Sequence, residues 1–213
     1  MIRTYFNGKA AIWDEMAAER DQSKLRQMAA RLDIWPGSTV LDIGTGTGVF
    51  LPFLRQRIGS EGKILALDIA EEMLHRAQTK AFDGVVAYLN ADAAHIPLPE
   101  SFVDSVVCYS SFPHFQDKAG ALAEMYRVLR NGGSLHICHT SCREAINGLH
   151  NGIPEVCHDV IPEEREMRLM LSEAGFADVE IEDNCENYLC RASKPGGLEG
   201  FGVELEADIQ RLR

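Results

Sequence analysis

The residues best suited to binding a ligand stand in one short stretch, where an acid precedes three closely spaced glycines. Asp42 ends an apolar run, and Gly44, Gly46 and Gly48 then alternate with threonines. Glycine adopts a positive φ without steric cost, and it has no Cβ to keep a ligand away from the backbone. A helix that begins after such a loop offers unpaired N–H groups to an anionic group. The stretch therefore predicts a buried strand, a ligand-binding loop and a helix, and Asp42 suggests that a cation or hydrogen-bond donors also bind there.

The spacing of these glycines separates several kinds of nucleotide loop. A dinucleotide loop needs Gly-x-Gly-x-x-Gly or Ala, but Val49 stands at the third position and the glycine comes one residue earlier, at Gly48. A phosphate loop of the Walker type is excluded because no Gly-Lys-Ser/Thr follows. A nucleotide-dependent oxidoreductase is therefore an alternative that Val49 disfavours.

Histidines form a second group of residues that could do chemistry. His114 comes just after a predicted strand, in the run that begins at Ser110, and His139 ends another predicted strand. An imidazole near its ordinary pKa can take a proton from a bound substrate. We therefore expect His114 and His139 to be candidate catalytic residues and Ser110 to contact the substrate, although each histidine could instead make a structural hydrogen bond.

A polar stretch over residues 140–162 interrupts the alternation of strands and helices, and we expect this insertion to lie over the active site. Its residues His150 and His158 are candidate substrate contacts. Together with His139 and two cysteines, these histidines would also suit zinc or a softer metal, or a thiol-ligated metalloid acceptor. No Cys-x-x-Cys pair is present, and we predict no metal.

Apolar runs and turn residues predict the elements that must position these groups. Strands are predicted at Thr39–Ile43, Lys63–Asp68, Val85–Leu89, Val103–Tyr109 and Ser134–His139, with helices between them at about 48–58, 71–80 and 117–129. This alternation predicts a doubly wound parallel sheet, which binds ligands beyond the carboxyl ends of its strands. Asp68, Asp92, Ser110 and His139 all fall at those ends, and this convergence supports a single site.

The two ends of the chain complete the predicted fold. Apolar spacing over residues 9–32 predicts two helices before the first strand, and Asn131-Gly132-Gly133 predicts a turn into the fifth. A helix at about 163–174 and an antiparallel pair of strands, 179–183 and 188–192, follow, with a short helix over 203–209. The expected fold class is a Rossmann-like, doubly wound, seven-stranded and mostly parallel sheet with an antiparallel closing strand and N-terminal helices.

Length, charge and cysteine content limit the function classes. The 213 residues suit a single domain, 1–213, in which residues 1–36 form a helical lid. The net charge of -11 disfavours a nucleic-acid partner, since such binding neutralises phosphates with Lys and Arg. No apolar run is long enough to span a membrane, and six cysteines without a secretion signal are typical of a cytoplasmic protein. We expect a monomer or homodimer that acts on a small molecule.

Five motifs in order give the chain a resemblance to a known family. They are the stretch Val40–Gly48, the acid Asp68, the pair Asp92-Ala93, the strand-four run Phe102–Val107, and Leu129-Arg130-Asn131-Gly132-Gly133. In this order they resemble the class I S-adenosylmethionine-dependent methyltransferases, with the quinone-biosynthesis C-methyltransferases as the most similar branch. The resemblance covers roughly three quarters of the chain, Val40 to Ala192, and Asn131 stands where the family has proline.

The resemblance implies a cofactor, S-adenosylmethionine, with S-adenosylhomocysteine as product, and a set of residues that hold it. The acid Asp68 matches the residue that holds the ribose, and the pair Asp92-Ala93 matches the residues that contact the adenine. Tyr5 and Trp13 are candidates for an aromatic lid. The complete expected set for the cofactor is Asp42, Gly44, Thr45, Gly46, Gly48, Asp68, Ile69, Met73, Asp92, Ala93, Tyr109, Tyr5 and Trp13.

The resemblance implies methyl transfer to a nucleophile, which mainly requires alignment in a dry, shaped site, and the family needs no metal. The residues do not distinguish O-, N-, C- or S-methylation, because all four use the same cofactor-binding half. Besides the oxidoreductase, a second alternative is a protein that binds the cofactor without catalysing methyl transfer.

Overall fold

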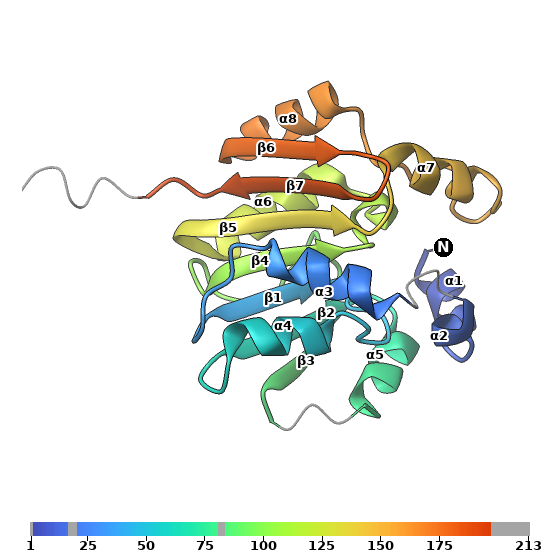
Figure 1. Cartoon of the computed structure of the whole chain (residues 1–213), viewed down its shortest axis with the longest axis horizontal. Helices are drawn as coiled ribbons and strands as arrows, with labels where there is room; N and C mark the ends of the chain where they lie inside the picture. Colours follow the sequence, from blue (N-terminus) through green and yellow to red (C-terminus); the bar gives the residue numbers. More distant parts are fainter. Residues whose placement is uncertain (1, 17–20, 81–83, 197–213) are drawn as a thin grey trace, which may run out of the picture.

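The structure is a computed structural model that describes residues 2–16, 21–80 and 84–196. The helix predicted over 203–209 lies outside these residues. One sheet of seven strands forms the centre, in the order β3-β2-β1-β4-β5-β7-β6 (Figure 1). The strands are β1 (Thr39–Ile43), β2 (Lys63–Asp68), β3 (Val86–Asn90), β4 (Val103–Tyr109), β5 (Leu129–His139), β6 (Ala177–Asp183) and β7 (Tyr188–Ser193).

The first five strands are parallel, and β7 runs antiparallel to both β5 and β6. The predicted fold class is therefore confirmed. The helices of the described part are α1 (Ile2–Lys9), α2 (Trp13–Met16), α3 (Gln22–Ala30), α4 (Leu51–Ile58), α5 (Glu71–Gln78), α6 (Lys118–Val128), α7 (Arg143–Asn151) and α8 (Glu164–Glu173), with a single 3-10 turn, η1 (Phe112–His114).

Alternation of apolar residues along β4 divides the core into two layers. Val106 and Cys108 pack with residues of α6 and α8, whereas Val107 and Tyr109 pack with residues of α3 and α4. Successive side chains of a strand point to opposite faces, so each face of the sheet carries its own helices. The carboxyl ends of the parallel strands stay uncovered by these two layers.

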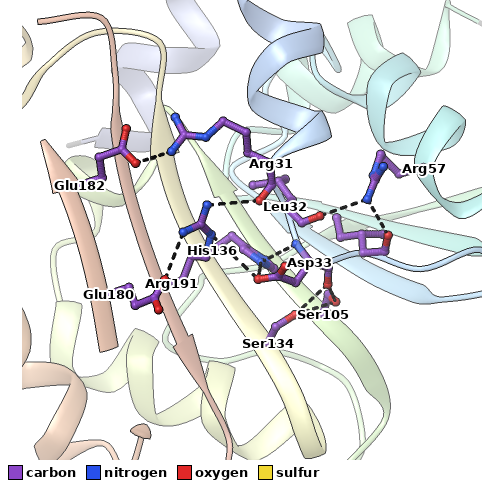
Figure 2. Close-up of polar contacts among 11 residues, drawn as sticks. Arg31, Leu32, Asp33, Arg57, Ser105, Ser134, His136, Glu180, Glu182 and Arg191 are labelled. Carbon is purple, nitrogen blue, oxygen red and sulfur yellow. Dashed lines mark hydrogen bonds and ion pairs between the residues drawn. The ribbon is translucent and has the colours of Figure 1, made fainter. Parts of the chain in front are cut away.

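Polar contacts fix the segment after α3 to three strands of the sheet (Figure 2). The guanidinium of Arg31 pairs with Glu182 of β6, and Arg191 of β7 donates to the Arg31 carbonyl oxygen at 3.4 Å. The backbone N–H of Asp33 donates to Nε2 of His136, a fully buried residue of β5, at 3.1 Å. These contacts anchor α3 and the start of β1, while α1 and α2 lie apart from them, near α5 (Figure 1).

Three local predictions differ from the structure. The predicted turn Asn131-Gly132-Gly133 lies inside β5 as a bulge, because Leu129 pairs with Val103 and Ser134 with Ser105 on either side of it. Two short helices and a third, α3, occupy the N-terminal region where two helices were expected. The polar insertion contains a helix, α7, which the sequence did not predict.

Candidate active site

A pocket of about 100 Å³ opens at the carboxyl ends of the parallel strands. Thirteen of the predicted site residues line it: Trp13, Asp42, Gly44, Thr45, Gly46, Asp68, Ile69, Met73, Asp92, Ala93, Tyr109, Ser110 and His114. The structure therefore brings together most of the residues that the sequence singled out.

The glycine loop after β1 forms the floor of the pocket. Gly44 and Gly46 have positive φ angles of 72° and 55°. A Cβ on Gly44 would lie 2.3 Å from the Cβ of Ser111, whereas a Cβ on Gly46 would meet nothing within 4 Å. Gly48 is buried and does not line the pocket, and a Cβ there would press on Leu51 at 2.9 Å. The close packing against Leu51 gives Gly48 a structural role, and its expected contact with the cofactor stays a prediction.

Asp68, at the end of β2, braces this loop. Its Oδ2 accepts a hydrogen bond from the backbone N–H of Gly46 at 2.8 Å, and its Oδ1 accepts one from Ala70 at 2.8 Å. The side chain is 7% exposed, and burial raises its pKa to about 6. Each carboxylate oxygen has a further lone pair. Asp68 can therefore accept hydrogen bonds from the loop and, at the same time, from hydroxyl groups of a ligand.

Asp42 lies deeper in the same wall. It is 1% exposed, and burial raises its pKa to about 7. Neither its Oδ2 nor the buried Oγ1 of Thr45 has a hydrogen-bond partner among the described residues. Buried polar atoms are normally satisfied, so these two indicate where a polar ligand would be held.

The opposite wall combines apolar and aromatic groups. Met73 is buried against Ala70 and Ala10, and Tyr109 stacks on Phe50 with 4.4 Å between ring centroids. Asp92 is exposed, and its Oδ1 accepts a hydrogen bond from the N–H of Ala94 at 2.9 Å. A planar, partly polar ligand group fits between such walls.

Two N-terminal aromatic rings close part of the pocket. Phe6 and Trp13 line it and pack edge to face with 5.5 Å between centroids, and Phe6 also packs on the ring of His114 at 5.0 Å. Tyr5, the expected lid residue, contacts Phe6 but does not line the pocket. The sequence analysis missed Phe6 because this segment has no clear apolar stripe. The sequence pattern therefore does not tell whether the ring of Tyr5 or that of Phe6 faces the pocket.

The predicted histidines separate into one that faces the pocket and three that do not. Nδ1 of His114 lies 2.8 Å from Oδ2 of Asp159. His150, buried in α7, contacts the His114 ring at 4.8 Å between centroids, and its Nδ1 donates to the carbonyl oxygen of Asp159 at 2.5 Å. His158 is exposed and lines no wall. Neither His150 nor His158 lines the pocket, so their contact with a substrate stays a prediction.

His139, the second candidate base, lies away from the pocket. It is 3% exposed and does not line the pocket, and burial lowers its pKa to about 3. A ring that stays neutral down to this pH takes up a proton poorly near neutrality. The sequence analysis also missed Asp159, which lies 45 residues from His114 and carries no local signal.

The described part of the chain contains no group of three or more His, Cys, Asp or Glu residues placed to hold a metal ion. The absence of a metal thus stays a prediction. The same described residues include no helix with the length and hydropathy to cross a membrane.

Comparison with known proteins agrees with the fold. The family described as "Methyltransferase domain" matches residues 41–137. The ubiquinone/menaquinone biosynthesis C-methyltransferase UbiE of Francisella philomiragia is 33% identical over 120 residues, which are 54% of this chain and 48% of that protein. A SAM-dependent methyltransferase of Aquifex aeolicus has a solved structure with a TM-score of 0.70 and 26% identity, covering 88% of this chain and 98% of that one. The chain is thus similar in sequence and in fold to S-adenosylmethionine-dependent methyltransferases.

The similar proteins differ in how much of their own length the chain covers. The chain spans about half the length of the curated relatives that it matches. A third similar protein, phosphoethanolamine N-methyltransferase 2 of Haemonchus contortus, was solved in complex with S-adenosylhomocysteine and phosphomonomethylethanolamine. Its structure has a TM-score of 0.67 and 17% identity, covers 82% of this chain and 53% of that one, and shows the shared fold.

The residues of the pocket fit S-adenosylmethionine, the cofactor of the similar methyltransferases. The unpartnered Oδ2 of Asp42 and Oγ1 of Thr45 lie in the wall of the glycine loop, where a charged ammonium and carboxylate need polar partners. The open side of Gly46 admits a ligand against the backbone. Carboxylates and aromatic faces also favour a positively charged sulfur nearby.

Replacing Gly44 with alanine is expected to destabilise the protein. The positive φ is unfavourable for alanine, and the added Cβ would meet Ser111, whose Oγ is held by the carbonyl oxygen of Ile43 at 2.6 Å. We expect a loss of about 2–4 kcal/mol in the free energy of unfolding, measured by urea denaturation. Gly132→Ala is the matched control, because its φ is also positive but a Cβ there meets nothing within 4 Å. Equal losses in both variants would contradict the role of the close contact.

The buried Asp42 is expected to make the stability of the ligand-free protein depend on pH. Its raised pKa means that the folded state keeps a proton that the unfolded state releases at about pH 4. The stabilisation is full below that pH and is lost as the pH rises through about 7. Asp42→Asn should therefore raise the melting temperature at pH 8, by roughly 2–4 °C per kcal/mol gained, and change it little at pH 5. Equal changes at both pH values in calorimetry would contradict this.

Proposed function

We propose that this protein transfers a methyl group from S-adenosylmethionine to a small-molecule acceptor. The observation that carries the proposal is the composition of one pocket. Its floor is the glycine loop with Asp42 and Asp68, and its far side presents His114 beneath the rings of Phe6 and Trp13. Cofactor-binding groups and a candidate proton acceptor thus share one space.

Each wall would have its own task. The glycine loop with Asp42 and Thr45 would hold the amino-acid end of the cofactor, Asp68 its ribose, and Asp92 with the buried Ala93 its adenine. When bound, the cofactor supplies a methyl group on a positively charged sulfur. The aromatic rings of the N-terminal segment would exclude water from that group.

Three observations support a small acceptor and a cytoplasmic setting. The net charge of -11 disfavours nucleic acid. The pocket is partly covered by Phe6 and Trp13, which leaves room for a small molecule. None of the six cysteines takes part in a disulfide bond, as expected in a reducing compartment. The relative UbiE, named as a quinone-biosynthesis C-methyltransferase, makes an activated ring carbon one acceptor worth testing.

The domain organisation belongs to the same proposal. We propose one domain over 1–213, a monomer or homodimer, in which residues 1–36 act as a lid and residues 140–162 as an insertion over the site. Phe6 and Trp13 in the pocket wall support the first role, and the contact of Asp159 with His114 supports the second.

Isothermal titration of the purified protein with S-adenosylmethionine, S-adenosylhomocysteine and NADH tests the cofactor half of the proposal. The proposal expects both sulfur cofactors to bind at micromolar concentration and NADH not to bind. Binding of NADH alone would favour an oxidoreductase. Binding of the sulfur cofactors without methylated product, across amine, phenol, thiol and quinol acceptors, would favour a non-catalytic binding protein.

A further inference from the structure

Asp159, in the insertion over residues 140–162, contacts a residue of the pocket wall. Asp159 follows α7 and is 8% exposed, and its Oδ2 lies 2.8 Å from Nδ1 of His114. The carboxylate can only accept at neutral pH, so the Nδ1 atom must carry the hydrogen. Nε2 of His114 makes no hydrogen bond within the described part of the chain, and the His114 ring lines the pocket. The pair therefore fixes both the orientation of the ring and its tautomer.

Other contacts hold both partners of this pair in place. The backbone carbonyl oxygen of Asp159 accepts from Nδ1 of His150 at 2.5 Å. Lys118 donates to the carbonyl oxygens of Pro113 and Phe115, on either side of His114, at 2.8 and 3.1 Å. These hydrogen bonds hold the backbone at His114 and at Asp159 in place. A fixed backbone is required if the His114 ring is to present Nε2 in one direction.

We propose that Asp159 is a positioning residue that holds Nδ1–H of His114 and directs Nε2 to a proton of the methyl acceptor. This inference rests on the proposed function and narrows its substrate class to acceptors that lose a proton: a hydroxyl, an amine, a thiol or an activated carbon acid. The proton passes to Nε2, while its former bonding pair stays on the acceptor. An electron pair of the acceptor forms the bond to the methyl carbon as the carbon–sulfur bond breaks with its pair on sulfur.

The charges around His114 are compatible with this role. Asp159 faces Nδ1, and Asp68 is a second carboxylate close enough to interact electrostatically with the His114 ring. His139 and His150 stand on the other sides, and burial lowers the pKa of both. Since both neighbours stay neutral near pH 7, they add no positive charge that would oppose proton uptake by His114.

The tautomer of His114 tests the inference independently of activity. In protein labelled with ¹⁵N-histidine, at a pH where the rings are neutral, long-range ¹H–¹⁵N NMR spectra distinguish the two ring nitrogens, and His114→Gln assigns the signals. We expect wild-type His114 to carry its hydrogen on Nδ1, and Asp159→Ala to shift the ring toward the Nε2–H form. Wild-type His114 with its hydrogen on Nε2 would overturn the inference, and this result needs no variant to fold.

Kinetics supply the second measurement, with an acceptor found by the screen. We expect Asp159→Ala to lower kcat by about 10–100-fold while the Kd for S-adenosylmethionine changes less than about threefold. The matched control is Asp104→Ala, which removes a carboxylate paired with Arg130 away from the pocket and should keep kcat. An equal loss in both variants would overturn the positioning role.

The two proposals fail in different ways. If wild-type protein binds no S-adenosylmethionine, the proposed function fails, whatever the tautomer of His114. If it binds the cofactor and His114 holds its hydrogen on Nε2, only the role of Asp159 fails.

Discussion

Asp68→Ala is expected to lower the affinity for S-adenosylmethionine by about 100-fold or more. Asp68 would accept two ribose hydroxyls, and a hydrogen bond to a charged group contributes about 1.5–3 kcal/mol, where 1.4 kcal/mol is a factor of ten. The change also removes the brace on the N–H of Gly46, so the loop that would hold the other end of the cofactor loosens. Isothermal titration measures the loss.

Two further variants separate binding from folding. Asp68→Asn keeps the shape of the side chain, and circular dichroism shows whether each variant is folded. Asp104→Asn makes the same chemical change away from the pocket and should bind as the wild type does. Unchanged affinity in a folded Asp68→Ala would contradict the assignment of the ribose to this acid.

His114→Gln is expected to slow methyl transfer by about 10²–10⁴-fold, the usual contribution of a general base. Glutamine keeps a polar side chain of similar length but cannot accept a proton at neutral pH. Cofactor affinity should change little, because the glycine loop, Asp42 and Asp68 remain. The measurement is the single-turnover rate with saturating cofactor, which excludes product release from the comparison.

A different histidine variant provides the contrast. His139→Gln changes a buried ring that does not line the pocket, so we expect it to affect stability more than rate. A rate within threefold of wild type for His114→Gln would contradict the general-base role. A loss of rate larger for His139→Gln than for His114→Gln would revive the original expectation for His139.

Elements with a strong local pattern were predictable from the sequence. The bounds of β1, β2 and β4 match the predicted ones because each is an apolar run that ends in a polar or turn residue. The ordering of strands and helices then placed Asp68, Asp92 and Ser110 at one edge. A parallel sheet aligns the carboxyl ends of its strands, so this part of the site followed from topology.

Features that depend on tertiary contacts were not predictable in the same way. The helix α7 has few buried residues, and its position depends on Asn147, which exchanges hydrogen bonds with the backbone of Ile161 at 2.8 and 3.1 Å. The bulge in β5 appears as a turn in the sequence because Gly132 adopts a positive φ, yet pairing with β4 resumes beyond it.

Side-chain direction explains the errors among the histidines. His114 and His139 both follow or end strands, and no local pattern tells which of the two rings faces the pocket. His139 ends β5 in a buried position, whereas the 3-10 turn after β4 carries His114 into the pocket wall. The contact between His114 and Asp159 joins segments that no local pattern relates.

The central claim is that one pocket binds S-adenosylmethionine and delivers its methyl group to a small acceptor. The most direct measurement is mass spectrometry of products formed from methyl-labelled S-adenosylmethionine and a panel of amines, phenols, thiols and quinols. We predict labelled product from at least one acceptor class, with S-adenosylhomocysteine formed in equal amount and both lost in His114→Gln. Bound cofactor with no labelled product from any class would contradict the claim.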